Sequence, residues 1–198
     1  FVYINSAKLN KHLMQGTFKE GLQHVPTLIK ELNALEIYLD QHRILVFNYK
    51  IATLYFGAGD YATSIDYLRR IINDHIDLRG DLQCYARLLH LIAHYELGND
   101  MLMESLTKSV YRFMSRLKNF TAVEEAMLNY LRRSITLRPR ELGAAFKDLL
   151  DQIKHLEKNR FQARAFAYLD VISWLEAKLS GKSMGEVIRE KYLASKHR

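Results

Sequence analysis

Two segments of this chain resemble each other at a spacing typical of stacked helical hairpins. Residues 49–68 read YKIATLYFGAGDYATSIDYL and residues 89–108 read LHLIAHYELGNDMLMESLTK. In each, a helical pattern reaches a tyrosine, a short turn containing glycine follows, and a second helical pattern begins. Tyr55 and Tyr95 occupy equivalent places, 40 residues apart. Repeats of this period bury their apolar faces against neighbouring repeats, so the spacing predicts a stack of helix pairs.

Apolar residues at helical spacing extend this organisation over the chain. No segment alternates as a strand does, which predicts an all-α fold. We expect about four antiparallel helix hairpins followed by one or two C-terminal helices. With two prolines and nine glycines in 198 residues, breakpoints are few, and a single domain is expected. The expected hairpins span residues 4–38, 41–75, 80–118 and 121–158, and the C-terminal helices span 160–194.

Several residues indicate where helices in the first half begin and end. Gly16 is a common type of helix stop, and Thr17 with Glu20 has the spacing of a capping box. Pro26 removes a backbone donor and should kink or split the helix that follows. Asp60 is placed to cap the second helix of its hairpin, as is Asn99 or Asp100 in the next hairpin.

The second half carries similar signals. Thr121 and Glu124 form another capping-box pattern, and Pro139 suits the first turn of a helix. One helix is expected from Arg160 to Leu179, stopped by Gly181. A short last helix is expected over residues 183–194.

The second hairpin resembles a tetratricopeptide repeat (TPR). Ile51, Ala52 and Tyr55 match the large, small and aromatic positions of that family's first helix. Gly59-Asp60-Tyr61 and Ser64 match the pattern that follows its turn. The third hairpin departs from the pattern, with Ile92, Asn99, Met101 and Glu104 at the corresponding places, and the 40-residue spacing exceeds the usual 34. The resemblance implies a divergent, TPR-like α-α superhelix, or solenoid.

Over nearly its whole length, the chain also resembles the C-terminal part of large, uncharacterised bacterial proteins with TPR-like repeats. The ordered segments that carry this resemblance are IATLYFGAGDY, DLRGDLQCYARLLHLIAHYELGN, SVYRFMSRLKNF and ISWLEAKLSGKSMGEVIREKY. It implies a helical-repeat fold and cytoplasmic residence, and it supplies no catalytic residues. The chain begins with Phe1, so we expect it to be a fragment of a longer chain.

TPR proteins bind peptides or helices in a concave groove lined by the first helix of each pair. By that geometry, groove positions fall on two hairpins of this chain. The predicted groove residues are Tyr49, Thr53 and Phe56 on one hairpin, and Leu89, His90, Ala93 and His94 on the next.

Residue patterns for cofactor or catalytic chemistry are incomplete. His90 and His94 share a helix face, but Leu91 stands where a zinc-protease helix needs glutamate, and no third ligand has a recognisable spacing. Gly57-Ala58-Gly59 lacks the Gly-Lys-Ser/Thr ending of a phosphate-binding loop. Cys84 is the only cysteine, which excludes an internal disulfide and favours a small buried residue. We expect no metal, no cofactor and no enzymatic activity.

The net charge of +7 comes from the second half of the chain, where Lys and Arg outnumber Asp and Glu by 19 to 11. Arg132, Arg133, Arg138 and Arg140 are candidate anion contacts, with a solvated basic face as the simpler interpretation. Nucleic-acid binding through these arginines is an alternative function, in which Tyr111 and Tyr130 would stack on bases.

The leading functional prediction is a non-enzymatic scaffold whose concave face binds a peptide or helix of another protein. We expect this partner to be acidic. A structural or self-association module is a further alternative, suggested by the apolar helix around Trp174. Apolar runs are too short for a transmembrane helix, the first residues do not form a secretory signal, and a cytoplasmic location fits the cysteine usage.

Overall fold

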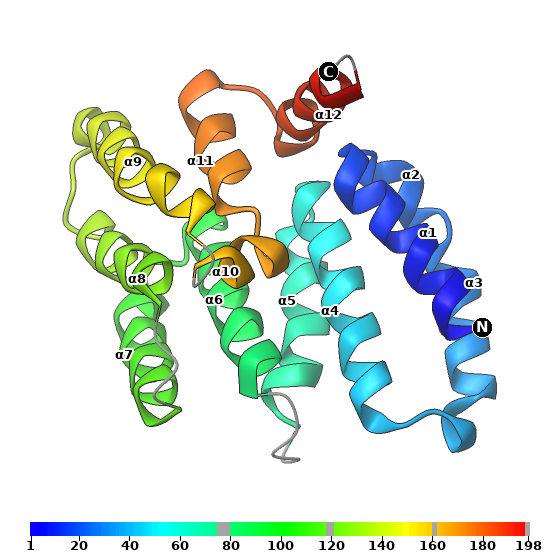
Figure 1. Ribbon diagram of the computed structural model, residues 1–198. Coiled ribbons are helices and arrows are strands. Elements are labelled where there is room, and N and C mark those ends of the chain that lie inside the picture. Colours follow the sequence, from blue (N-terminus) through cyan, green and yellow to red (C-terminus); the bar gives the residue numbers. More distant parts are fainter. Residues whose placement is uncertain (75–79, 118–120, 160–161, 197–198) are drawn as a thin grey trace. The chain divides into compact units, whose positions relative to one another are not determined.

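The computed structural model describes residues 1–74, 80–117, 121–159 and 162–196. Every regular element in these ranges is a helix, so the expected all-α class is confirmed (Figure 1). The predicted limits at residues 75, 118 and 160 lie outside the described ranges. Contacts divide the chain into two compact units, Phe1–Arg79 with Ser183–Arg198, and Gly80–Lys182. The expectation of one domain stays a prediction.

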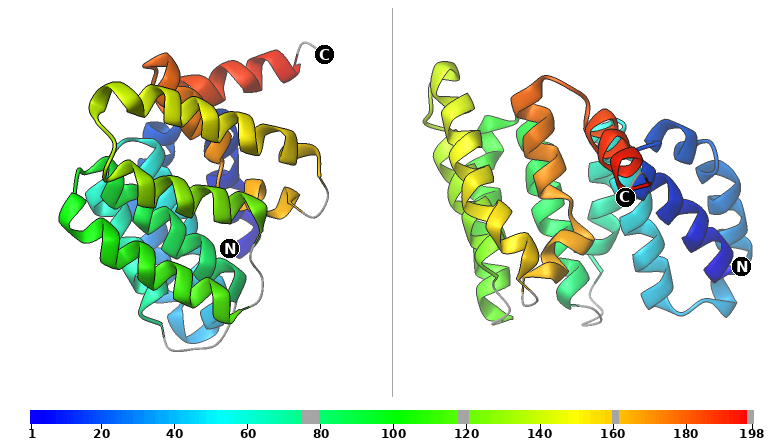
Figure 2. Two further views of the ribbon diagram at one scale, coloured as in Figure 1. Left: turned by 90° about the vertical axis from the view of Figure 1, so that its left-hand side faces the viewer. Right: turned by 45° about the horizontal axis from the view of Figure 1, so that its top comes forward.

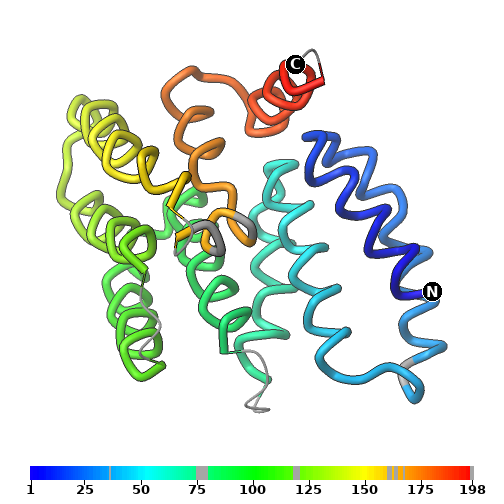
Figure 3. Tube along the Cα trace, in the orientation of Figure 1, coloured from blue at the N-terminus to red at the C-terminus, as the bar shows by residue number. Residues whose placement is uncertain are grey.

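The first unit consists of a split helical hairpin, a regular hairpin and the last helix of the chain. Helices α4 and α5 pack closely against each other, and α1 and α2 both pack on α4. Figure 3 traces the chain from α1 to α12, which lies beside α1. The elements are α1 (Val2–Gln15), α2 (Phe18–Leu22), α3 (Val25–Ala34), η1 (Glu36–Tyr38), α4 (Gln41–Gly57), α5 (Tyr61–Ile72) and α12 (Met184–Lys196).

The second unit continues the pairing of consecutive helices. α6 packs on α7, α7 on α8, and α8 on α9, while α11 packs on α9 (Figure 2). The elements are α6 (Gly80–Glu96), α7 (Asp100–Arg116), α8 (Ala122–Ser134), α9 (Pro139–Lys154), η2 (His155–Lys158), α10 (Ala163–Tyr168) and α11 (Val171–Ser180).

Most of the predicted helix ends are confirmed. Gly16 ends α1 in the left-handed conformation (φ 66°), which glycine adopts without steric cost. The Asp60 carboxylate accepts a hydrogen bond from the Thr63 N–H at 3.0 Å, and Thr121 and Glu124 form the predicted capping box. Pro139 occupies the first turn of α9. These local signals need only a few neighbouring residues, so they survive in the folded chain.

Two predicted features of the first unit differ in detail. Thr17 lies at the N-cap of α2, but its hydroxyl makes no cap bond; it lies 2.8 Å from Nδ1 of His12 instead. The predicted capping box there is therefore wrong. Pro26 splits the expected long helix, because α2 ends at Leu22 and α3 starts with the proline in its first turn.

The single helix predicted from Arg160 to Leu179 is wrong for the described residues. Leu169 adopts an extended conformation (φ −135°, ψ 109°), which separates α10 from α11. The Asp170 carboxylate then accepts a hydrogen bond from the Ser173 N–H at 2.9 Å and caps α11. Asp170 can cap the start of a second helix, but an aspartate can also occupy an interior position of one continuous helix. Apolar periodicity therefore did not reveal the break between α10 and α11.

The core of the first unit is formed by the inner faces of its hairpins. Leu9 of α1, Leu28 of α3 and Leu54 of α4 are at most 2 % exposed and belong to one apolar cluster. Phe18 fills the space above Gly57, where a Cβ atom would lie 2.4 Å from the phenyl ring. The close approach of α2 to α4 therefore requires glycine at position 57, which holds the split hairpin against the regular one.

Candidate binding surface

The predicted groove side chains are mostly covered. Tyr49, Phe56, His90 and His94 each expose less than a tenth of their surface, as do Leu89 and Ala93. Thr53 is half-buried, and its hydroxyl donates to the Tyr49 carbonyl at 2.9 Å. These side chains are mostly covered because α4 and α6 are surrounded by neighbouring helices and have almost no solvent face. The prediction that these residues contact a partner therefore gains no support from their exposure.

The two histidines of α6 contact each other and the turn that follows. Their rings meet edge to face with centroids 4.6 Å apart. Nδ1 of His94 lies 2.9 Å from the Asn99 side-chain amide, so His94 connects the end of α6 to the N-cap position of α7. No cluster of three or more potential metal ligands occurs among the residues that the structure describes. A role in fixing this turn accounts for His94.

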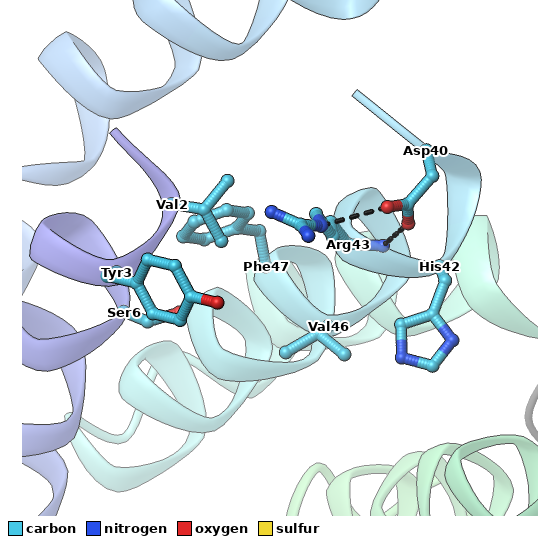
Figure 4. Close-up of a pocket in the computed structure, with 8 residues that line it drawn as sticks. All are labelled: Val2, Tyr3, Ser6, Asp40, His42, Arg43, Val46 and Phe47. Carbon is cyan, nitrogen blue, oxygen red and sulfur yellow. Dashed lines mark hydrogen bonds and ion pairs between the residues drawn. The ribbon is translucent and has the colours of Figure 1, made fainter. Parts of the chain in front are cut away.

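An open pocket of about 550 Å³ lies between the N-terminal parts of α1 and α4 (Figure 4). These two helices are the first members of consecutive helix pairs and pack on each other. Residues three and four apart on a helix share a face, so the first turns of each helix contribute one wall. The lining residues are Val2, Tyr3 and Ser6 from α1, and Asp40, His42, Arg43, Val46 and Phe47 from the start of α4.

The floor of this pocket is apolar. Phe47 is 1 % exposed, and its ring centroid lies 6.1 Å from that of Phe1. Val2 faces Phe47 from the opposite helix, and Val46 extends the apolar wall (Figure 4). When an apolar group of a ligand binds on such a floor, its apolar surface is removed from water, which makes the free energy of binding more favourable. The pocket is thus suited to an aliphatic or aromatic side chain.

Charged groups occupy the rim at the start of α4. The Asp40 carboxylate accepts a hydrogen bond from the Arg43 N–H at 2.9 Å, which caps α4. The same carboxylate pairs with Nε of Arg43 at 2.8 Å, and both side chains remain about half exposed. This pairing fixes the direction of the guanidinium, whose remaining N–H groups can bind a carboxylate.

Tyr3 is the most exposed aromatic residue of the pocket, with 84 % of its surface accessible, and its neighbour Ile4 is 62 % exposed. Sequence reasoning did not single out either residue: the first hairpin was expected to begin at residue 4, whereas α1 begins at Val2. A helical projection from Leu9 backwards would have placed Tyr3 and Ile4 on the outer face. Exposed apolar residues beside a pocket are frequent in interaction sites.

The four predicted anion contacts all lie near the turn between α8 and α9. Arg132 and Arg133 are in the last turn of α8, Arg138 is the N-cap of α9, and Arg140 follows in its first turn. All four are exposed. Nε of Arg138 donates to the Glu141 carboxylate at 2.9 Å. The sequence therefore identified a set of residues that the fold brings to one end of a helix pair.

The aromatic residues of the second unit form a core. The Tyr130 hydroxyl lies 3.3 Å from that of Tyr95, and the ring of Phe146 contacts both. Burial, followed by the hydrogen bond that the Tyr130 hydroxyl makes with Tyr95, raises the pKa of Tyr130 well above its ordinary value. Tyr130 is 5 % exposed, so it offers no ring face for stacking on a base, whereas Tyr111 is 56 % exposed.

Trp174 also belongs to this core and exposes 3 % of its surface. Its indole N–H donates to the Glu96 carboxylate at 2.6 Å, and Lys178 pairs with the same carboxylate. The helix around Trp174 was the reason to consider self-association. With its indole enclosed, Trp174 itself provides no surface for that interaction.

A second pocket, of about 620 Å³, lies between the α1–α2 turn, the end of α4 and the start of α12. Its glycines are explained by close packing. A Cβ atom at Gly16 would lie 2.3 Å from the carbonyl oxygen of Gly185, and one at Gly185 would lie 2.8 Å from that of Gly16. Gly16 and Gly185 thus allow α12 to approach α1 at backbone distance.

None of the described helices combines the length and apolar character needed to cross a membrane. No protein-family model, curated protein or solved structure matches this chain. Its likeness to TPR proteins therefore depends on the residue pattern of the second hairpin and on the helix pairs.

Proposed function

We propose that this chain is a TPR-like interaction module that acts by binding another protein, without catalysis. The pocket between α1 and α4 is its binding site for an apolar side chain of a peptide or helix. The observation that carries this proposal is the location of the pocket between the first helices of two consecutive pairs. In TPR proteins, the first helices line the groove that receives a peptide.

The chemistry of the pocket defines the partner. Phe47, Val2 and Val46 favour an apolar side chain, and Tyr3 adds a large amphipathic surface at the rim. Arg43 favours a nearby carboxylate on the partner. The ligand class is a segment that carries an aromatic or aliphatic residue next to an acidic one. A cytoplasmic location remains the expectation for such a module.

Selection from a random peptide library displayed on phage tests this function. Peptides that are enriched on the wild-type chain should contain an apolar residue next to Asp or Glu. Fluorescence anisotropy of a labelled selected peptide should show that Tyr3→Ala and Val46→Lys each weaken binding about tenfold or more, as loss of an interface anchor does. Tyr38→Ala is the matched control, because Tyr38 is also highly exposed (82 %) but does not line the pocket. Failure to enrich any peptide, or equal binding by all three variants, would contradict the proposal.

Nucleic-acid binding is a second candidate, favoured by the exposed arginines of the α8–α9 turn. Phosphate contacts by arginine produce an affinity that falls steeply with salt. A gel-shift titration with single-stranded and double-stranded nucleic acid at two salt concentrations checks this candidate. Absence of binding at low salt would eliminate it.

A further inference from the structure

The arginines of the α8–α9 turn lack the structural roles that commonly explain surface arginines. Arg132, Arg133 and Arg140 are exposed, and none of them forms an ion pair within the part of the chain that the structure describes. Only Arg138 pairs, with Glu141. Between residues 128 and 148, five Lys or Arg side chains outnumber two acidic ones. Like charges held at one turn repel each other, so folding alone does not favour this cluster.

A shallow groove between α8 and α9 lies directly beside this cluster. It has a volume of about 40 Å³, enough for a methyl group or a water molecule. Arg133 and Leu137 line it with the small side chains of Ala126 and Ala145. The polar side chains that also line it are Asn129, Asp148 and Gln152. At the same turn, Ile135 is 36 % exposed. The surface therefore combines guanidinium groups with a small depression whose lining is partly apolar and partly polar.

We propose that this α8–α9 surface binds an acidic segment of another protein. Carboxylates of the segment pair with Arg132, Arg133 and Arg140, and a methyl group of a small aliphatic residue such as alanine or valine enters the depression beside Leu137. The guanidinium fork matches a carboxylate in a bidentate arrangement, and these exposed guanidinium groups have N–H donors available for it. Since all these residues belong to the second unit, the inference does not depend on the α1–α4 pocket.

The structure favours an acidic protein segment over nucleic acid for this surface. Single-stranded nucleic acid is bound by positive grooves that also supply aromatic stacking platforms. Tyr130 is the aromatic residue that lines the α8–α9 groove, and it is buried. The arginine cluster also occupies one turn, whereas nucleic-acid binding depends on several phosphate contacts along a strand. A short run of carboxylates fits the size and chemistry of the cluster.

A titration with a defined probe tests this inference. The probe is a fluorescein-labelled 12-residue peptide in which Asp and Glu alternate with Ala and Val, and binding is followed by anisotropy. The double variant Arg132→Glu/Arg133→Glu should weaken binding about tenfold or more. The matched control is Arg112→Glu/Arg116→Glu, which makes the same charge change at exposed positions of α7; it should weaken binding less than about threefold.

Two further measurements keep the interpretation clear. Arg132→Lys/Arg133→Lys retains the charge but loses bidentate pairing, so its affinity should fall between those of the wild type and the glutamate variant. Circular dichroism should show unchanged helicity for every variant. Equal weakening by both glutamate double variants would overturn the inference, because it would indicate attraction to net charge alone. Absence of peptide binding, or displacement of the peptide by a 20-nucleotide RNA at lower concentration than by unlabelled peptide, would also overturn it.

Discussion

Replacing Lys178 by Met removes the cation that faces a nearly enclosed carboxylate. The Glu96 side chain is 5 % exposed and binds both Lys178 and the indole N–H of Trp174, whereas the Lys178 side chain is 34 % exposed. Breaking a fully buried ion pair costs about 3–5 kcal/mol. Water can reach the Lys178 side of this pair, so we expect Lys178→Met to lower the free energy of unfolding by about 1–3 kcal/mol.

Urea denaturation followed by fluorescence measures this change, because Trp174 is the only tryptophan and reports on the second unit. Lys154→Met is the matched control. Lys154 pairs with Glu176 at 3.0 Å, but their side chains are 56 % and 24 % exposed, so its loss should cost at most about 1 kcal/mol. In a Glu96→Gln background, the effect of Lys178→Met should fall to less than half, because the carboxylate is gone. Equal effects of the two lysine substitutions, or no reduction in that background, would refute the reasoning.

Three other perturbations test separate parts of the fold. Gly16→Ala should destabilise the first unit by about 2 kcal/mol or more, because alanine disfavours the left-handed conformation and its Cβ would collide with the carbonyl oxygen of Gly185; urea denaturation measures this. Asp170→Ala should cost about 1 kcal/mol through loss of the α11 cap, measured in the same way. The pKa of His12 lies below its ordinary value because burial, and then the neighbouring His24, disfavour its charged form. Its stabilising contribution is therefore present above about pH 6.5 and lost as the pH falls, and His12→Gln should reduce the change in urea midpoint between about pH 7 and pH 5.

Each of these perturbations has a matched comparison. Gly59 also has a positive φ (86°) but open space around it, so Gly59→Ala should lower the free energy of unfolding by only about 1 kcal/mol. An equal loss in Gly59→Ala and Gly16→Ala would contradict the proposed collision between the Cβ atom at position 16 and the carbonyl oxygen of Gly185. Asp170→Asn keeps a capping acceptor and should be nearly neutral; a loss equal to that of the alanine variant would contradict the cap. A His24→Gln variant should retain part of the pH dependence, because burial is the larger cause of the His12 shift. Complete loss of this pH dependence in His24→Gln would contradict burial as the larger cause of the His12 pKa shift.

Local signals in the sequence predicted much of the fold. Asp60, Gly16 and Pro139 act through hydrogen bonds or backbone angles within one turn, so their roles do not depend on distant packing. The expected start of the second hairpin, residue 41, is the first residue of α4. Apolar periodicity did not locate the break before α11, because Leu169 and Asp170 fit a continuous helix as well as a capped one.

The candidate site could be predicted only in part. The arginines of the α8–α9 turn were identified because exposed charge is visible in the composition of a segment. The predicted groove on α4 and α6 depended on which face of a helix meets solvent, and both helices are enclosed by their neighbours. The α1–α4 pocket depends on Tyr3 and Phe47, which are 44 residues apart in sequence, and on a first helix that begins at Val2, before the expected start of its hairpin at residue 4. Such juxtapositions arise from tertiary packing.

Site-specific photo-crosslinking tests most directly whether the α1–α4 pocket receives the partner. Benzoylphenylalanine replaces Val46 in the pocket wall, and in a matched control it replaces Ala62, which is exposed on α5. With a peptide selected on the wild-type chain, we predict a crosslink from position 46 that unlabelled peptide abolishes, and none from position 62. Crosslinking from position 62 with none from position 46 would contradict the proposed binding site.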